Sequence, residues 1–246
     1  MPDPLFDDWI ARHYATLWPE LFDPAVVDPT VDFLAELAEQ AGSGPALEFG
    51  IGTGRIAIPL RRRGIPVSGI ELSPAMADQL TRVSEPGMEV AIGDFASTGL
   101  GRTFSLVYLV RNTITNLTTQ DEQVEAFRNA AEHLEPGGCF VIENYIPALR
   151  QLPPGQTEHV FTATPTHVGI ERYDLAAQVA TSHHWWVLDG ELRTFSSPHR
   201  YVWPAELDLI ARIAGLRLEH RYEDWHRTPF TAESPSHVSV WRKPAS

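Results

Sequence analysis

The residues best suited to chemistry lie between Glu48 and Gly54, in the stretch EFGIGTG. A short apolar run ends at Glu48, and glycines follow at every second position before a helical pattern begins. Because glycine has no Cβ, a ligand can approach such a backbone closely. The spacing differs from the G-x-G-x-x-G of dinucleotide sites, and no Gly-Lys-Ser/Thr of a phosphate loop follows. A carboxylate would repel a pyrophosphate, so the stretch favours a ligand that carries an ammonium group.

The elements that must position this loop alternate along the central part of the chain. Strand-like apolar runs are expected at 45–49, 65–72, 88–95, 104–110 and 139–146. Helical patterns are expected at 53–64, 73–83 and 119–134. Strands that are apolar on both faces and alternate with helices predict an α/β fold with a parallel sheet covered on two sides. The glycine loop then lies at the carboxyl ends of the strands, where ligands bind in such sheets.

Different patterns flank this α/β region. Helices are expected within 4–18 and 29–42, and three strand-like segments between 151 and 203 include a hairpin turn at Asp189-Gly190. A helix at 204–215 and two closing strands complete the chain. The expected domains are a helical lid at 1–42, a core at 43–150 and 204–246, and an antiparallel β insertion at 151–203. The insertion is expected either to cap the site where the second ligand, the acceptor, would bind or to form an oligomer contact such as that of a homodimer.

Composition narrows the class of partner. The chain has 246 residues and a net charge of −13, so it repels phosphodiester backbones, and a nucleic-acid substrate is not expected. No apolar run approaches the ~20 residues that a membrane helix needs. A single cysteine, Cys139, and the lack of a conventional signal peptide predict a cytoplasmic protein without disulfides. Small neutral or cationic molecules remain as ligands.

Four motifs in order resemble those of the class I S-adenosylmethionine-dependent methyltransferases. LEFGIGTG (47–54), GIELSPAM (69–76) and GDF (93–95) resemble the first three motifs of the family, and LEPGGCFVIE (134–143) resembles the turn and strand that follow the active-site helix. The resemblance implies a Rossmann-like, mostly parallel seven-stranded sheet whose last strand is antiparallel. It also implies S-adenosyl-L-methionine as cofactor and S-adenosyl-L-homocysteine as product.

The same resemblance implies roles for individual residues. Glu48 and the glycines would lie against the amino-acid part of the cofactor, and Glu71 would accept hydrogen bonds from both ribose hydroxyls. Asp94 would receive the adenine amino group, with Phe95 beside the ring. The cofactor-binding residues expected on this basis are Tyr14, Glu48, Gly50, Gly52, Gly54, Arg55, Glu71, Leu72, Met76, Gly93, Asp94, Phe95 and Asn112.

Methyl transfer needs alignment of the acceptor with the methyl group and, for a phenol or enol, a base within hydrogen-bond reach. Asn112 and Asn144-Tyr145 follow strands and are expected to position the acceptor, and Glu143 is a further candidate base. The residues expected to take part in catalysis are His13, Asn112, Tyr145, His183 and His184. Adjacent strand residues point to opposite faces, so only one histidine of the 183–184 pair can face the cavity. No metal site is expected, because no nearby cluster has ligand spacing.

The expected function is therefore methylation of nitrogen or oxygen in a small, natural-product-like molecule. Two alternatives stay open at this point. A nicotinamide-dependent oxidoreductase shares a glycine turn and an acidic residue after the second strand, but the chain lacks G-x-G-x-x-G and a Tyr-x-x-x-Lys pair. A non-catalytic S-adenosylmethionine-binding protein would keep Glu48 and Glu71 but lack an acceptor pocket.

Overall fold

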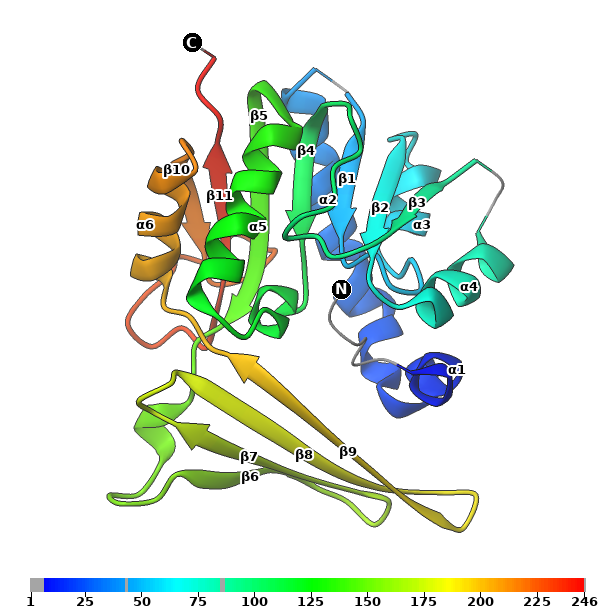
Figure 1. Ribbon diagram of the computed structural model, residues 1–246, viewed down its shortest axis with the longest axis vertical. Coiled ribbons are helices and arrows are strands. Elements are labelled where there is room, and N and C mark those ends of the chain that lie inside the picture. Colours follow the sequence, from blue (N-terminus) through cyan, green and yellow to red (C-terminus); the bar gives the residue numbers. More distant parts are fainter. Residues whose placement is uncertain (1–6, 43, 85–86, 246) are drawn as a thin grey trace.

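The computed structural model describes residues 7–42, 44–84 and 87–245, and a seven-stranded sheet forms the centre of the fold (Figure 1). Its strand order is β10-β11-β5-β4-β1-β2-β3. The five strands from β5 to β3 in this order run parallel, whereas β11 is antiparallel to both of its neighbours. The strands are β1 (Ala46–Phe49), β2 (Val67–Glu71), β3 (Glu89–Ile92), β4 (Phe104–Leu109), β5 (Leu134–Tyr145), β10 (Arg217–Tyr222) and β11 (Ser236–Arg242). The predicted fold class is confirmed.

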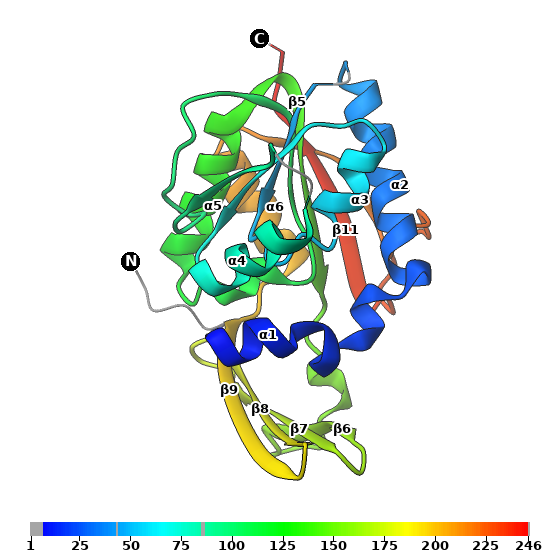
Figure 2. The ribbon, with the colours of Figure 1, turned by 90° about the vertical axis from the view of Figure 1, so that its right-hand side faces the viewer.

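Helices cover both faces of this sheet (Figures 1 and 2). One apolar cluster packs α5 and α6 against the sheet, and a second packs α2 and α3 against the other face. This double cover explains why β1 and β4 are buried along their whole length. The α-helices are α1 (Asp8–Leu17), α2 (Pro24–Gln40), α3 (Ala57–Arg62), α4 (Pro74–Val83), α5 (Gln120–His133) and α6 (Pro204–Ile213). In the described part of the chain, no helix has the length and apolar character needed to cross a bilayer.

Three boundaries differ from the sequence-based expectation. Helix α2 begins at Pro24, five residues before the expected start, because Asp23 caps it by accepting a hydrogen bond from the backbone N–H of Ala25. Helix α3 begins only at Ala57, since the glycine loop before it is non-helical. The expected turn at 135–138 lies inside β5, as an irregularity between residues that pair with β4 on either side. The first six residues of the chain, where part of the first helix was expected, lie outside the described residues.

The insertion forms a second, four-stranded antiparallel sheet of order β6-β7-β8-β9. Its strands are β6 (Glu158–Ala163), β7 (His167–Asp174), β8 (Val179–Leu188) and β9 (Glu191–Arg200). Sequence analysis missed β6, whose alternation of polar and apolar residues is interrupted by a register shift after Val160. The small sheet lies across the end of the core where the parallel strands terminate, and α1 lies close to β9 (Figures 1 and 2).

A buried polar network joins the small sheet to the core at the end of β9. The Arg200 guanidinium donates to Oε1 of Gln123 at 2.5 Å and to Oε1 of Glu206 at 2.7 Å. The Nε2 amide of Gln123 donates to the backbone carbonyls of Ile114, Leu117 and Arg200. Gln123 and Arg200 are almost fully buried, so the lost hydration of each group is replaced by these partners. This network determines how the small sheet is held over the strand ends.

We predict that Arg200→Met lowers the free energy of unfolding by about 3–5 kcal/mol, because it leaves Gln123 and Glu206 buried without their charged partner. Although burial raises the pKa of Glu206, hydrogen bonds from Arg200, Gln120 and Gln178 lower it below its ordinary value. The contribution is therefore complete at neutral pH and is lost as the pH falls through that lowered pKa. Urea denaturation of the variant at pH 7 measures the loss. Arg128→Met, which breaks an exposed pair with Glu125, should cost less than about 1 kcal/mol, and equal losses in both variants would contradict the prediction.

Candidate functional site

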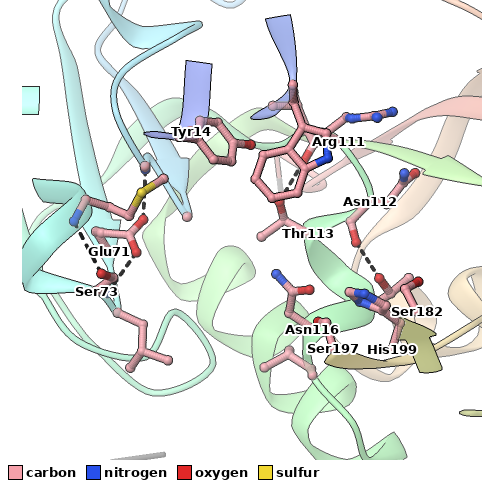
Figure 3. A pocket seen from close by; sticks show the side chains of 18 of the residues that line it. Tyr14, Glu71, Ser73, Arg111, Asn112, Thr113, Asn116, Ser182, Ser197 and His199 are labelled. Carbon is pink, nitrogen blue, oxygen red and sulfur yellow. Dashed lines mark hydrogen bonds between the residues drawn. The ribbon is translucent and has the colours of Figure 1, made fainter. Parts of the chain in front are cut away.

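A cavity of about 610 Å³ lies between the carboxyl ends of the core strands and the inner face of the small sheet. Figure 3 shows Glu71 and Ser73 at one end, Asn116 in the middle, and Asn112 with Ser182 and His199 at the other end. Segments that are far apart in the sequence therefore share one site. Its polar and aromatic lining includes Tyr14, Trp18, Glu48, Arg55, Glu71, Asp94, Asn112, Tyr145, Glu171, Ser182, His184, Ser197 and His199.

The three glycines of the loop after β1 have different tasks, although all have positive φ. A Cβ on Gly52 would lie 3.4 Å from the Met76 methyl group, and both residues line the cavity. A Cβ on Gly50 would lie 2.8 Å from Cγ2 of Thr113. A Cβ on Gly54 would lie 2.3 Å from Cδ1 of Leu80, away from the cavity. Gly54 is thus required by packing, and its predicted place in the cofactor site is not supported by its position.

Glu71 ties the glycine loop to the start of α4. Its Oε2 accepts a hydrogen bond from the backbone N–H of Gly52 at 2.8 Å, and its Oε1 accepts one from Ser73 at 2.8 Å. Burial raises the pKa of this carboxyl, and the backbone donors oppose the shift. Since each carboxylate oxygen has a second lone pair, Glu71 can still accept hydrogen bonds from a ligand.

Glu48 is the most deeply buried carboxyl of the cavity wall, with 3% of its surface exposed. Its Oε2 accepts a hydrogen bond from the Tyr108 hydroxyl at 2.9 Å. Burial raises the pKa of Glu48 to about 8, although Tyr108 and the nearby Arg55 guanidinium lower it in part. The ionised form therefore becomes favourable when a ligand brings a positive charge next to it.

The third predicted motif provides the wall next to β3. Asp94 Oδ1 accepts a hydrogen bond from the backbone N–H of Ala96 at 2.8 Å. The Phe95 ring stacks on the Phe49 ring, with 5.5 Å between the ring centroids. Both Asp94 and Phe95 line the cavity. Gly93 does not line the cavity, because it packs against Thr98. A Cβ added to Gly93 would lie only 2.1 Å from the Thr98 Oγ1 atom. Leu72 lines the cavity as predicted from its position after Glu71.

Asn112 follows β4 and lies in the cavity wall. Arg111 and Asn112 have φ of +55° and +59°, a left-handed conformation that costs roughly 1–2 kcal/mol for each L-residue. Asn112 Oδ1 accepts a hydrogen bond from the backbone N–H of Tyr145 at 2.8 Å. Glu143 holds this turn by accepting from the backbone N–H of Arg111 and from Trp225 Nε1. Because Glu143 does not line the cavity, its position gives no support to a role as a base.

The histidines of β8 lie on opposite faces of the small sheet. His184 is buried on the inner face and lines the cavity, whereas His183 lies on the outer face beside Ser196. Burial and the neighbouring histidines lower the pKa of His184 to about 4, so its ring is uncharged at neutral pH. His13 is also outside the cavity lining, and its Nδ1 is paired with the Trp9 carbonyl one helical turn away. The structure therefore does not bring His13 and His183 together with the other predicted catalytic residues, and their roles stay predictions.

Several cavity residues were not expected from the sequence. The inner face of the small sheet contributes Glu171, Ser182, Ser197 and His199, and Trp18 lies just after α1. Ser182 shares the strand parity of His184, so alternation along β8 is the one signal that could have found it. Glu171 and Ser197 pair with Ser182 from the neighbouring strands, and only the register of the sheet brings them together.

Comparison with known proteins identifies a matching family and several similar methyltransferases. Residues 46–138 match a family described as a methyltransferase domain. The cypemycin N-terminal methyltransferase of a Streptomyces species is 28% identical over 196 residues, covering 76% of this chain and 78% of the relative. A dTDP-4-amino-2,3,4,6-tetradeoxy-D-glucose N,N-dimethyltransferase of Saccharopolyspora spinosa is 35% identical over 97 residues, which is 39% of each chain.

Among solved structures, the CcbJ methyltransferase from Streptomyces caelestis is 36% identical, with a TM-score of 0.84 and full coverage of both chains. DesVI of Streptomyces venezuelae is 22% identical with a TM-score of 0.69, covers 94% of this chain and 98% of that chain, and shares the fold. The similarity to the S. caelestis protein extends through the flanking helices and the small sheet. On this similarity and the order of its motifs, the chain belongs to the class I S-adenosylmethionine-dependent methyltransferase family.

Proposed function

We propose that the protein transfers the methyl group of S-adenosylmethionine to the nitrogen of a small, natural-product-like amine. The observation that carries this proposal is the continuity of the cavity, which joins the strand-end loops of Glu48 and Glu71 to the polar inner face of the small sheet. A protein that only bound the cofactor would not need the second half of this space. The names of two relatives, an N-terminal methyltransferase and an amino-glucose N,N-dimethyltransferase, support nitrogen as the acceptor atom.

The residues at the core end of the cavity fit the parts of the cofactor. Glu48 is a buried carboxyl beside open space, which suits the ammonium of the methionine moiety. Glu71 keeps lone pairs for the two ribose hydroxyls, and Gly52 leaves room for close approach to the backbone. Asp94 and Phe95 are placed for the adenine amino group and ring. When bound, the cofactor supplies an activated methyl group on a positively charged sulfur.

The remaining segments would exclude water and align the acceptor. We assign residues 1–42 the role of a lid, because Tyr14 and Trp18 line the cavity from the N-terminal helical segment. Residues 151–203 would cap the acceptor. Of the predicted catalytic residues, Asn112, Tyr145 and His184 line the cavity and are the ones retained in the proposal.

The direct test combines binding and turnover. S-adenosylhomocysteine at 100 times its dissociation constant should stabilise the folded protein by about 2.7 kcal/mol, measured by thermal unfolding, whereas NADH should have no effect. A library of primary and secondary amines, each paired with the matching alcohol, should then yield S-adenosylhomocysteine from the amines. Stabilisation by NADH alone would overturn the cofactor assignment, and turnover restricted to alcohols would overturn nitrogen as the acceptor.

Gly52→Val should abolish S-adenosylhomocysteine binding in a protein that stays folded, because the side chain would enter the cavity beside Met76. Gly64→Val is the matched control. Gly64 also has positive φ, at +88°, but no heavy atom lies within 4 Å of its Cβ position. Both variants therefore carry the backbone strain of a β-branched residue, and only Gly52→Val should lose binding in a calorimetric titration. Retained binding in Gly52→Val, or loss in both, would remove Gly52 from the site.

Cofactor binding should release a proton from Glu48 near neutral pH. With a pKa of about 8, this carboxyl is mostly protonated at pH 7, and a bound ammonium favours its ionised form. Affinity for S-adenosylhomocysteine should therefore rise with pH between 6 and 8, by up to about tenfold per unit. Calorimetry at pH 7 in two buffers of different ionisation enthalpy measures the proton directly. Glu48→Gln should bind without proton release, and the same release from this variant would assign the proton to another group.

A further inference from the structure

The end of the cavity remote from Glu71 carries a compact polar group on the inner face of the small sheet. Glu171, Ser182 and Ser197 occupy one cross-strand row of β7, β8 and β9, and His199 is two residues further along β9. Figure 3 shows Ser182, Ser197 and His199 close together at this end. Tyr145, at the end of β5, faces the same space from the core. Phe161 and Phe195 line the cavity beside this group. The register of the small sheet thus creates a polar patch inside an aromatic wall.

Glu171 is a cavity carboxylate that has no counterion within the described part of the chain. It accepts hydrogen bonds from the Tyr173 hydroxyl and from Ser182 Oγ, the latter at 3.3 Å. Among residues 7–42, 44–84 and 87–245, no cationic side chain forms an ion pair with it. A half-buried carboxylate in such a place attracts a cationic ligand, because no protein charge competes for it.

Two buried polar atoms near Glu171 also have no partner within the described chain. They are the Tyr145 hydroxyl oxygen and Nδ1 of His199. Burial lowers the pKa of His199 to about 4, so the ring is neutral at pH 7 and one of its nitrogens can accept a hydrogen bond. Because Nδ1 is enclosed, Nε2 is the ring atom available to a ligand. Buried polar atoms without partners are uncommon, and two of them belong to residues that line the cavity at this patch.

We infer that this patch is the acceptor subsite and that it selects an amine over a hydroxyl compound, with Glu171 as its charge partner and His199 as the hydrogen-bond acceptor that orients the amine N–H. This inference rests on the proposed function. In the reaction, the nitrogen lone pair forms the new N–C bond while the C–S bond breaks and its electron pair stays on sulfur. The positive charge passes from sulfur to nitrogen, where Glu171 stabilises it.

The charge balance explains the preference. An amine attacks in its neutral form, so an ammonium that binds beside Glu171 must first lose one proton to solvent. The methylated product is again a cation, which can leave the site and lose its proton to solvent. A hydroxyl acceptor would have to be deprotonated first, and the neutral histidines of this cavity are weak bases, because burial lowers the pKa of both His184 and His199 to about 4. The site is therefore equipped to stabilise a cation at the acceptor atom rather than to create an alkoxide.

Two rings of the same shape test the inference without a known substrate. Pyrrolidine is a cation at neutral pH, and tetrahydrofuran is its uncharged analogue. With the protein saturated by S-adenosylhomocysteine, ligand-observed NMR should show pyrrolidine binding about tenfold more tightly than tetrahydrofuran, the range for one charge-assisted contact. Glu171→Gln keeps the volume and one acceptor oxygen but removes the charge, and it should remove this preference. Glu191→Gln makes the same charge change at an exposed position of the same sheet and should leave it intact.

A second pair of variants separates the histidines. His199→Asn should weaken pyrrolidine binding by about fivefold, the value of one hydrogen bond, while His183→Asn on the outer face should not. Equal binding of the two rings, no binding of pyrrolidine, or a preference that survives Glu171→Gln would overturn the inference. S-adenosylhomocysteine affinity should stay within about twofold in all four variants. Failure of the unaltered protein to bind S-adenosylhomocysteine would instead overturn the proposed function.

Discussion

The carboxylate of Glu71 is the group that connects the parts of this site. It accepts backbone hydrogen bonds from Gly52 and Ser73 and thereby joins the glycine loop, the end of β2 and the start of α4. These segments also need glycines of positive φ and a Ser73 N-cap, because the chain turns sharply where each parallel strand ends. The core sheet presents the loops, and Glu71 keeps them at a spacing that leaves a cavity between them.

Acidic side chains predominate among the charged residues that line the cavity. Glu48, Glu71, Asp94 and Glu171 all line it, in a chain with a net charge of −13. The cavity histidines are neutral, since burial lowers the pKa of His184 and His199. A cationic cofactor and an acceptor that becomes cationic suit such a lining. The carboxylates of Glu71, Asp94 and Glu171 would disfavour a phosphate-bearing dinucleotide, in agreement with the spacing of the glycine loop.

Position along a strand accounts for which of the predicted site residues line the cavity and which do not. Glu48, Glu71 and Asn112 were found because they come at or just after the ends of parallel strands, and those ends meet at one edge of the sheet. Gly54 and Gly93 belong to the same motifs but pack against Leu80 and Thr98, so motif membership did not imply contact with the cavity. For residues 183 and 184, alternation predicted that one would face the cavity, and the structure identifies His184.

The α/β core, the order of its motifs and the location of the site at the carboxyl ends of the strands could be predicted from the amino-acid pattern alone, because they depend on local hydrophobic patterns and short turns. The same pattern also predicted the antiparallel character of the insertion, from strand propensity and the Asp189-Gly190 turn. Two features required the tertiary structure. One is the face of the small sheet that covers the core, and the other is the cross-strand row shared by Glu171, Ser182 and Ser197. Those features depend on strand register and on the buried Arg200–Gln123 network, whose partners are 77 residues apart, and no local pattern encodes such a distant pairing.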